Sequence, residues 1–140
     1  MRSGRPILLV EDDRVDAMTV HRALADINIS NRLDVVGDGE EAQQFLRDPR
    51  NDTPCIILLD LNLPRMNNIE FLRAAKRDEG LKRIPVVVLT TSRDERDKVE
   101  SFSLGVAGCI VKPMDYHQFV EAVRTIDLYW TLSELPAEEG

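Results

Sequence analysis

The chain lacks several features that mark common functional classes. Its two cysteines, Cys55 and Cys109, show no CxxC spacing and no histidine cluster accompanies them, so neither a disulfide framework nor a zinc site is implied. No block of lysine and arginine stands out, and the net charge of −7 opposes attraction to nucleic acid backbones. No apolar run approaches the roughly 18 residues that a membrane span requires. We therefore expect a soluble, cytoplasmic protein with no DNA or membrane partner.

Short apolar runs are present instead, and each is followed by a helical pattern. The runs occupy residues 7–10, 33–36, 56–59, 85–90 and 107–111. Such short runs are typical of parallel strands that are buried on both faces of a sheet. Because 140 residues correspond to about one domain, we predict an α/β domain with a doubly wound, five-stranded parallel sheet and five helices.

Charged and hydroxyl side chains follow these apolar runs. In doubly wound folds the ligand site lies beyond the carboxyl ends of the strands, so residues that follow different strands can converge on one rim. The candidates are Glu11, Asp12, Asp38, Asp60, Thr90 and Lys112. Asp60 is the central one, since an unbroken apolar run leads directly into it. The alternative is that Asp60 only caps the next element, a usual role for a strand-end aspartate.

The chemistry of these residues favours phosphoryl transfer. Glu11, Asp12 and Asp60 would place three carboxylates in one cleft, where like charges repel and a divalent cation relieves the repulsion. Mg²⁺ is the best candidate, because it keeps several waters and takes one or two carboxylates together with phosphoryl oxygen. Lys112 would offer a positive charge and Thr90 a hydroxyl to the same phosphoryl group. A carboxylate can itself be the nucleophile that forms an aspartyl phosphate.

Four motifs in this order resemble the receiver domain of two-component response regulators. They are Val-Glu-Asp-Asp at 10–13, Leu-Asp-Leu-Asn-Leu-Pro at 59–64, Leu-Thr-Thr-Ser at 89–92 and Val-Lys-Pro at 111–113. Each motif is weak alone, but the four with their spacing are highly specific. The resemblance covers residues 7 to about 129 and implies a flavodoxin-like (βα)5 receiver fold with strand order 2-1-3-4-5. It places the receiver domain at residues 1–130 and a C-terminal tail at 131–140.

The resemblance implies a role for each acid and for one backbone carbonyl. Asp60 would accept the phosphoryl group and also contribute to the metal shell. Asp12 would bind Mg²⁺ directly, and Glu11 would act on it mainly through bound water. The backbone carbonyl of Asn62 would complete the protein's share of the metal ligands.

Two further residues would act on the phosphoryl group. The resemblance implies that Lys112 anchors it, with a cis bond to Pro113, and that Thr90 follows it during switching. Cys109 stands where such receivers usually carry an aromatic switch residue. The usual coupling between the threonine and a moving ring is therefore not expected in its familiar form.

The function implied is that of a single-domain response regulator. It would accept a phosphoryl group from a sensor histidine kinase and signal through phosphorylation-dependent contact with another protein. It would not be a conventional enzyme, since it catalyses only its own phosphorylation and dephosphorylation. Residues 126–130 are similar to the end of stand-alone receivers that work beside bacterial phytochromes. Output would be a downstream protein target, or a homodimer through the fourth helix, fifth strand and fifth helix.

Two other classes of function were weighed against this one. A dehalogenase-type phosphatase also forms an aspartyl phosphate, but it needs a second acid where this chain has Asn62. A pseudo-receiver that is never phosphorylated would be expected to lack one of the carboxylates, the threonine or the lysine, and none is missing. The aromatic residues Tyr129 and Trp130 can simply extend the apolar face of the last helix.

Overall fold

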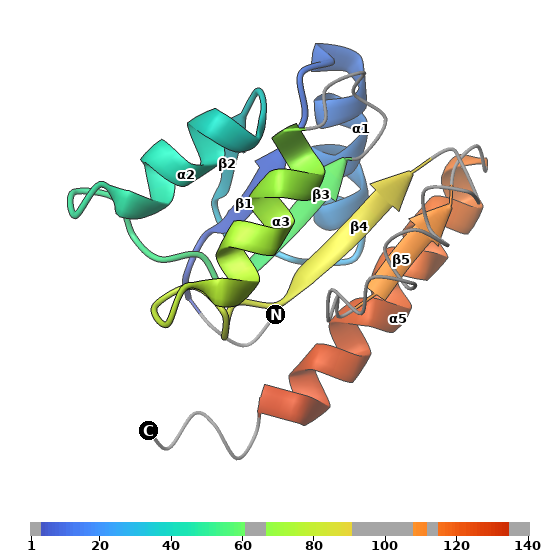
Figure 1. Cartoon of the computed structure of the whole chain (residues 1–140). Helices are drawn as coiled ribbons and strands as arrows, with labels where there is room; N and C mark the ends of the chain where they lie inside the picture. The colour runs from blue at the N-terminus through green and yellow to red at the C-terminus, as the bar shows by residue number, and fades with distance from the viewer. Residues whose placement is uncertain (1–3, 61–66, 91–107, 112–114, 135–140) are drawn as a thin grey trace.

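The structure, a computed structural model, describes residues 4–60, 67–90, 108–111 and 115–134. Strands and helices alternate along the chain, as predicted (Figure 1). The elements are β1 (Ile7–Val10), α1 (Arg14–Asp26), β2 (Leu33–Val36), α2 (Gly39–Arg47), β3 (Ile56–Asp60), α3 (Asn67–Arg77), β4 (Val86–Thr90), β5 (Gly108–Val111) and α5 (Tyr116–Glu134). The fourth of the five predicted helices, which would follow β4 in the sequence, lies outside the described residues.

The five strands form one parallel sheet in the order β2-β1-β3-β4-β5, which confirms the predicted fold and strand order. β1 lies between β2 and β3, so the connections leave β1 and β3 in opposite directions and create a switch point between these two strands. Val10 is paired with Leu59 in this register. The residues that follow them, Glu11 and Asp60, therefore stand side by side at the carboxyl edge of the sheet.

Helices cover both faces of the sheet. One apolar cluster packs α1 and α5 against one face, and a second packs α2 and α3 against the other (Figure 1). Leu9 and Leu58 belong to the first cluster, whereas Leu8 and Leu59 belong to the second. Successive residues of a strand thus point to opposite faces of the sheet, and both faces are buried. Burial of each large apolar side chain stabilises the fold by roughly 1.5–3 kcal/mol.

The second strand departs from the prediction that all five strands are buried. Val35 is 49 % exposed, and Leu33 and Val36 are only partly buried. β2 is an edge strand with β1 as its single neighbour, and Asp34 interrupts its apolar run. The position of the strand in the sheet thus leaves apolar surface open beside α1.

Local hydrogen bonds determine where α1 begins and ends. Asp13 is the N-cap, and its Oδ1 accepts hydrogen bonds from the backbone N–H of Val15 at 2.8 Å and of Asp16 at 3.1 Å. Asn28, which follows the C-cap Ile27, adopts a positive φ of 64°, a conformation that asparagine tolerates better than most residues. The cap formed by Asp13 holds the first helical turn directly after β1.

The last helix begins at Tyr116 and continues to Glu134, past residue 130. The Tyr116 hydroxyl donates a hydrogen bond to Asp26 Oδ2, and the Arg22 guanidinium lies 4.4 Å from the centroid of the Tyr116 ring. These contacts tie the start of α5 to the end of α1. In the part of the chain that the structure describes, none of the helices combines the length and the apolar character needed to cross a membrane.

Candidate functional site

Two buried carboxylates lie at the carboxyl edge of the sheet. Glu11 is 4 % exposed and Asp60 is 1 % exposed, and they are the only buried polar or charged residues in the described chain. Burying a carboxylate is costly unless it is compensated, so a pair of them in adjacent positions is not explained by core packing. Asp60 is the last residue of β3, whereas α3 begins at Asn67, so Asp60 is not adjacent to the helix that follows.

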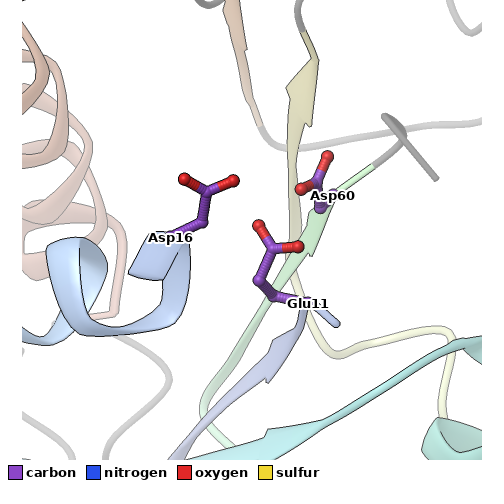
Figure 2. A group of neighbouring side chains, drawn as sticks. All are labelled: Glu11, Asp16 and Asp60. Atoms are coloured by element: carbon purple, nitrogen blue, oxygen red, sulfur yellow. The ribbon is translucent and has the colours of Figure 1, made fainter. Parts of the chain in front are cut away.

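A third acid completes this cluster. One carboxylate oxygen from each of Glu11, Asp16 and Asp60 lies within 4.8 Å of the other two. Figure 2 shows the three side chains directed toward a common space, from the end of β1, the first turn of α1 and the end of β3. Asp16 is partly buried. We call these three residues the acidic cluster.

Backbone hydrogen bonds connect two members of the acidic cluster through Asp13. The Asp13 N–H donates to Oε2 of Glu11 at 3.3 Å, and Asp13 Oδ1 accepts from the N–H of Asp16 at 3.1 Å. The negative charge of Asp16 is also favourable in the first turn, where the helix dipole is positive. The sequence thus places Asp16 at the rim through the cap that starts α1.

The donor set of the acidic cluster suits a divalent metal ion. Carboxylate oxygens are hard ligands of the kind preferred by Mg²⁺, Mn²⁺ and Ca²⁺, and three negative charges at this separation favour a bound cation. The cation would also offset the cost of burying Glu11 and Asp60. The residues therefore fit a divalent metal ion, and Asp16 is an additional member of the set that the sequence did not predict.

The other predicted site residues have different positions. Asp12 is exposed and is not part of the acidic cluster among the described residues. Thr90 ends β4, where it pairs with Val111 of β5, so its backbone lies on the same edge as Asp60; its side chain lies outside the described residues. Asn62 and Lys112 also lie outside the described residues.

The sequence reasoning missed Asp16. The strand-end rule does not identify it, because that rule considers only residues that follow a strand directly. The available signal was its place three residues after the N-cap Asp13, which puts it in the first turn and hence close to the sheet edge. Its distance to Asp60 depends on how α1 packs against the sheet, which spacing along the chain does not give.

A cavity of about 860 Å³ opens beside the acidic cluster, between α1 and β2. Its lining includes Glu11 and three apolar side chains that are largely exposed: Val15 at 70 %, Met18 at 65 % and Val35 at 49 %. Apolar side chains grouped on the surface are a mark of interaction sites. We call Val15, Met18 and Val35 the α1–β2 patch.

Comparison with known proteins gives a family for the chain. The family model described as the response regulator receiver domain matches residues 7–124. The response regulator Rcp1 of the cyanobacterium Synechocystis is 38 % identical over 128 residues, which cover 89 % of this chain and 87 % of that protein.

Solved structures of similar proteins have the same architecture. The Mn²⁺-bound form of Rcp1 is 38 % identical with a TM-score of 0.77, and the match covers 90 % of this chain and 94 % of that one. The phosphorylated cyanobacterial phytochrome response regulator RcpA is 39 % identical with a TM-score of 0.78 and coverage of 92 % and 95 %. The bacteriophytochrome response regulator RtBRR is 41 % identical with a TM-score of 0.75 and coverage of 87 % and 77 %.

Proposed function

The chain belongs to the response regulator receiver family, and from this premise we propose that Asp60 is the aspartate that accepts the phosphoryl group. A receiver of this family signals through an aspartyl phosphate and is not a conventional enzyme. Burial of Asp60 within the acidic cluster is the observation that carries the assignment. Asp60 is also the last residue of β3, the strand that lies between β1 and β4.

The reaction assigned to Asp60 is a displacement at phosphorus. A carboxylate oxygen of Asp60 forms a bond to phosphorus while the phosphorus–nitrogen bond of a phosphohistidine breaks, and the histidine nitrogen leaves and takes up a proton. Mg²⁺, when bound, supplies positive charge that offsets the charge of the transferring group. Asp12, Asp60 and the backbone carbonyl of Asn62 would hold it, with Glu11 acting mainly through water.

Thr90 and Lys112 are assigned to the phosphoryl group once it is attached. Support comes from the sheet, because β4 and β5 follow β3 in order and their carboxyl ends share the edge of Asp60. Lys112 follows the last residue of β5 and would contribute a point charge, and the Thr90 hydroxyl would donate a hydrogen bond. Both groups interact with the phosphorylated state more strongly than with the free carboxylate, which shifts the conformational equilibrium.

The donor assigned to this receiver is a sensor histidine kinase, with a phytochrome-like kinase as the specific candidate. Similar proteins are named as phytochrome response regulators, which supports this choice. The kinase would contact the α1–β2 patch, since these exposed apolar side chains lie beside the acidic cluster. Output would pass to a downstream protein or to a second copy through the fourth helix, β5 and α5. The receiver unit would span residues 1–130 and the tail 131–140.

Labelling with a small phosphodonor tests the assignment of Asp60. The purified protein is incubated with acetyl phosphate and Mg²⁺, and intact mass spectrometry measures the phosphorylated fraction. We expect the wild type to be labelled and Asp60→Asn to remain unlabelled, because the amide is a poor nucleophile. Asp52→Asn, at an exposed position away from the acidic cluster, is the matched control and should label normally. Equal labelling of Asp60→Asn and the wild type would overturn the assignment.

A further inference from the structure

We propose that Asp16 is a positioning residue for the metal ion: it accepts hydrogen bonds from metal-bound water and so raises the affinity for Mg²⁺ without being a required direct ligand. The inference rests on the proposed function, since it concerns the same site. Its starting point is the acidic cluster, in which oxygens of Glu11, Asp16 and Asp60 lie within 4.8 Å of one another (Figure 2).

The separations in the acidic cluster allow contact through water as well as direct binding. The three oxygens lie within 4.8 Å of one another, and two oxygens bound to one Mg²⁺ at about 2.1 Å are at most about 4.2 Å apart, so this limit admits both arrangements. Mg²⁺ also retains several of its waters, and these need hydrogen-bond acceptors. Asp16 is only partly buried, unlike Glu11 and Asp60, and so stands where such waters have space.

The position of Asp16 is held by the chain around it. Its backbone N–H donates to Asp13 Oδ1 at 3.1 Å, and the Asp13 N–H donates to Glu11 Oε2 at 3.3 Å. Asp13 therefore connects the backbone of Asp16 to the side chain of Glu11. A hydrogen-bond acceptor that is already held in place loses little conformational entropy when it binds a metal-bound water. Such acceptors around a metal site therefore raise the affinity of the protein for the metal.

A similar protein binds a divalent ion, since a solved structure of Rcp1 is of its Mn²⁺-bound form. Mn²⁺ and Mg²⁺ share a preference for oxygen ligands in octahedral arrangement. In this chain Asp16 adds a third carboxylate to those of Glu11 and Asp60, which increases both the attraction for a cation and the repulsion within the metal-free cluster.

Metal titration is the first test. Isothermal titration calorimetry with MgCl₂ compares the wild type with Asp16→Asn, which keeps the size of the side chain and removes its charge. We expect the Kd for Mg²⁺ to rise about 10-fold, the lower end of the effect of losing a group that supports metal ligands. Glu40→Gln is the matched control, because Glu40 is an exposed acid in the first turn of α2. The Kd of this control for Mg²⁺ should stay within about twofold of the wild type, since Glu40 is not a member of the acidic cluster and its exposed charge is screened by salt.

Thermal unfolding separates this role from a purely structural one. Asp16 also favours α1 through the helix dipole, so a structural role predicts that Asp16→Asn lowers the Tm equally with EDTA and with Mg²⁺. The positioning role predicts that the increase in Tm caused by Mg²⁺ becomes smaller in Asp16→Asn, and that part of this increase returns in Asp16→Glu, which restores the charge. A Tm loss that is the same in both conditions overturns the inference.

The two proposals fail in different ways. If the wild type binds Mg²⁺ and is labelled on Asp60, while Asp16→Asn binds Mg²⁺ equally well, only the role of Asp16 is wrong. If the wild type neither binds Mg²⁺ nor is labelled, the proposed function itself is wrong.

Discussion

Asp60 and Glu11 occupy positions where an apolar residue would pack more easily. Both are buried, Asp60 ends β3 and Glu11 directly follows β1, and their carboxylates lie within 4.8 Å of each other. Two negative charges at this distance repel each other, and a cation between them reduces the repulsion. A divalent cation that binds here would therefore stabilise the folded protein.

The N-cap Asp13 allows helix stability and metal binding to be measured separately. Asp13→Ala removes the acceptor for Val15 and Asp16, so the free energy of unfolding should fall by about 1 kcal/mol. It should also weaken Mg²⁺ binding, because the turn that carries Asp16 loses its support. Asp38→Ala is the matched control: Asp38 caps α2 through the N–H of Glu41 at 2.9 Å and is not a member of the acidic cluster.

Urea denaturation and Mg²⁺ titration of these two variants give the comparison. The two losses of stability should be similar, and only Asp13→Ala should change the affinity for Mg²⁺. Equal Mg²⁺ affinities in the two variants would contradict the link from Asp13 to the site.

Individual site residues differ in how far the sequence predicts them. Glu11 and Asp60 could be found because each ends an apolar run, and parallel strands bring their carboxyl ends to one edge. Asp16 could not be found in this way, because its place in the acidic cluster depends on how α1 packs against the sheet. Hydrophobic periodicity identifies the face of a helix that is buried, but it does not identify the strand that its first turn approaches.

At the scale of elements, the contact between α1 and α5 makes stability depend on pH. Burial raises the pKa of Tyr116, and its hydrogen bond to Asp26 raises it further, while Arg22 opposes the shift. The pKa of Tyr116 is thus higher in the folded protein than in the unfolded chain, where it is near 10. The stabilisation that Tyr116 contributes is therefore complete below pH 10 and is lost as the pH rises through the pKa of the folded state. The hydrogen bond between Tyr116 of α5 and Asp26 of α1 should therefore be lost at alkaline pH.

Tyr116→Phe tests this contact, because it keeps the ring beneath Arg22 and removes the hydroxyl that donates to Asp26. We expect the wild type to be more stable than the variant at neutral pH, and the difference to shrink as the pH rises above 10. Urea denaturation at a series of pH values measures it. A difference that stays constant through this range would exclude ionisation of Tyr116 as its cause. Thr125→Ser, on the exposed side of α5, is a control for mild changes in that helix.

The sequence predicts the boundaries of helices and strands better than it predicts how deeply each element is buried. The boundaries of β1 and β4 and the cap of α1 follow from apolar runs and from a side chain that can accept hydrogen bonds. The exposure of Val35 was not predicted, because whether a strand is central or at the edge depends on the sheet order and not on its own four residues. The sheet order itself came from resemblance to a family and not from the pattern of the strands.

At the scale of the whole molecule, the α1–β2 patch and the acidic cluster lie next to each other. The cavity between α1 and β2 is lined both by Glu11 of the acidic cluster and by the α1–β2 patch. A protein donor that covers the patch would bring its phosphohistidine close to Asp60, whereas a small donor needs only the acidic cluster. Contacts between the kinase and the α1–β2 patch would orient the phosphohistidine and so accelerate transfer from the kinase, but they would not act on a small phosphodonor. A substitution in the patch should therefore slow phosphotransfer from the kinase and leave labelling by the small donor unchanged.

Met18→Glu provides this comparison, because Met18 is 65 % exposed and contributes little to the core. A charge placed in an apolar contact should slow phosphotransfer from the cognate kinase by about 10-fold, as expected for loss of an important contact residue. Labelling by acetyl phosphate should be unchanged. Gln44→Glu introduces the same charge at an exposed position of α2 and should leave both rates intact. Equal slowing with both donors would mean that Met18→Glu damages the acidic cluster, and no slowing with the kinase would place its contact surface away from α1 and β2.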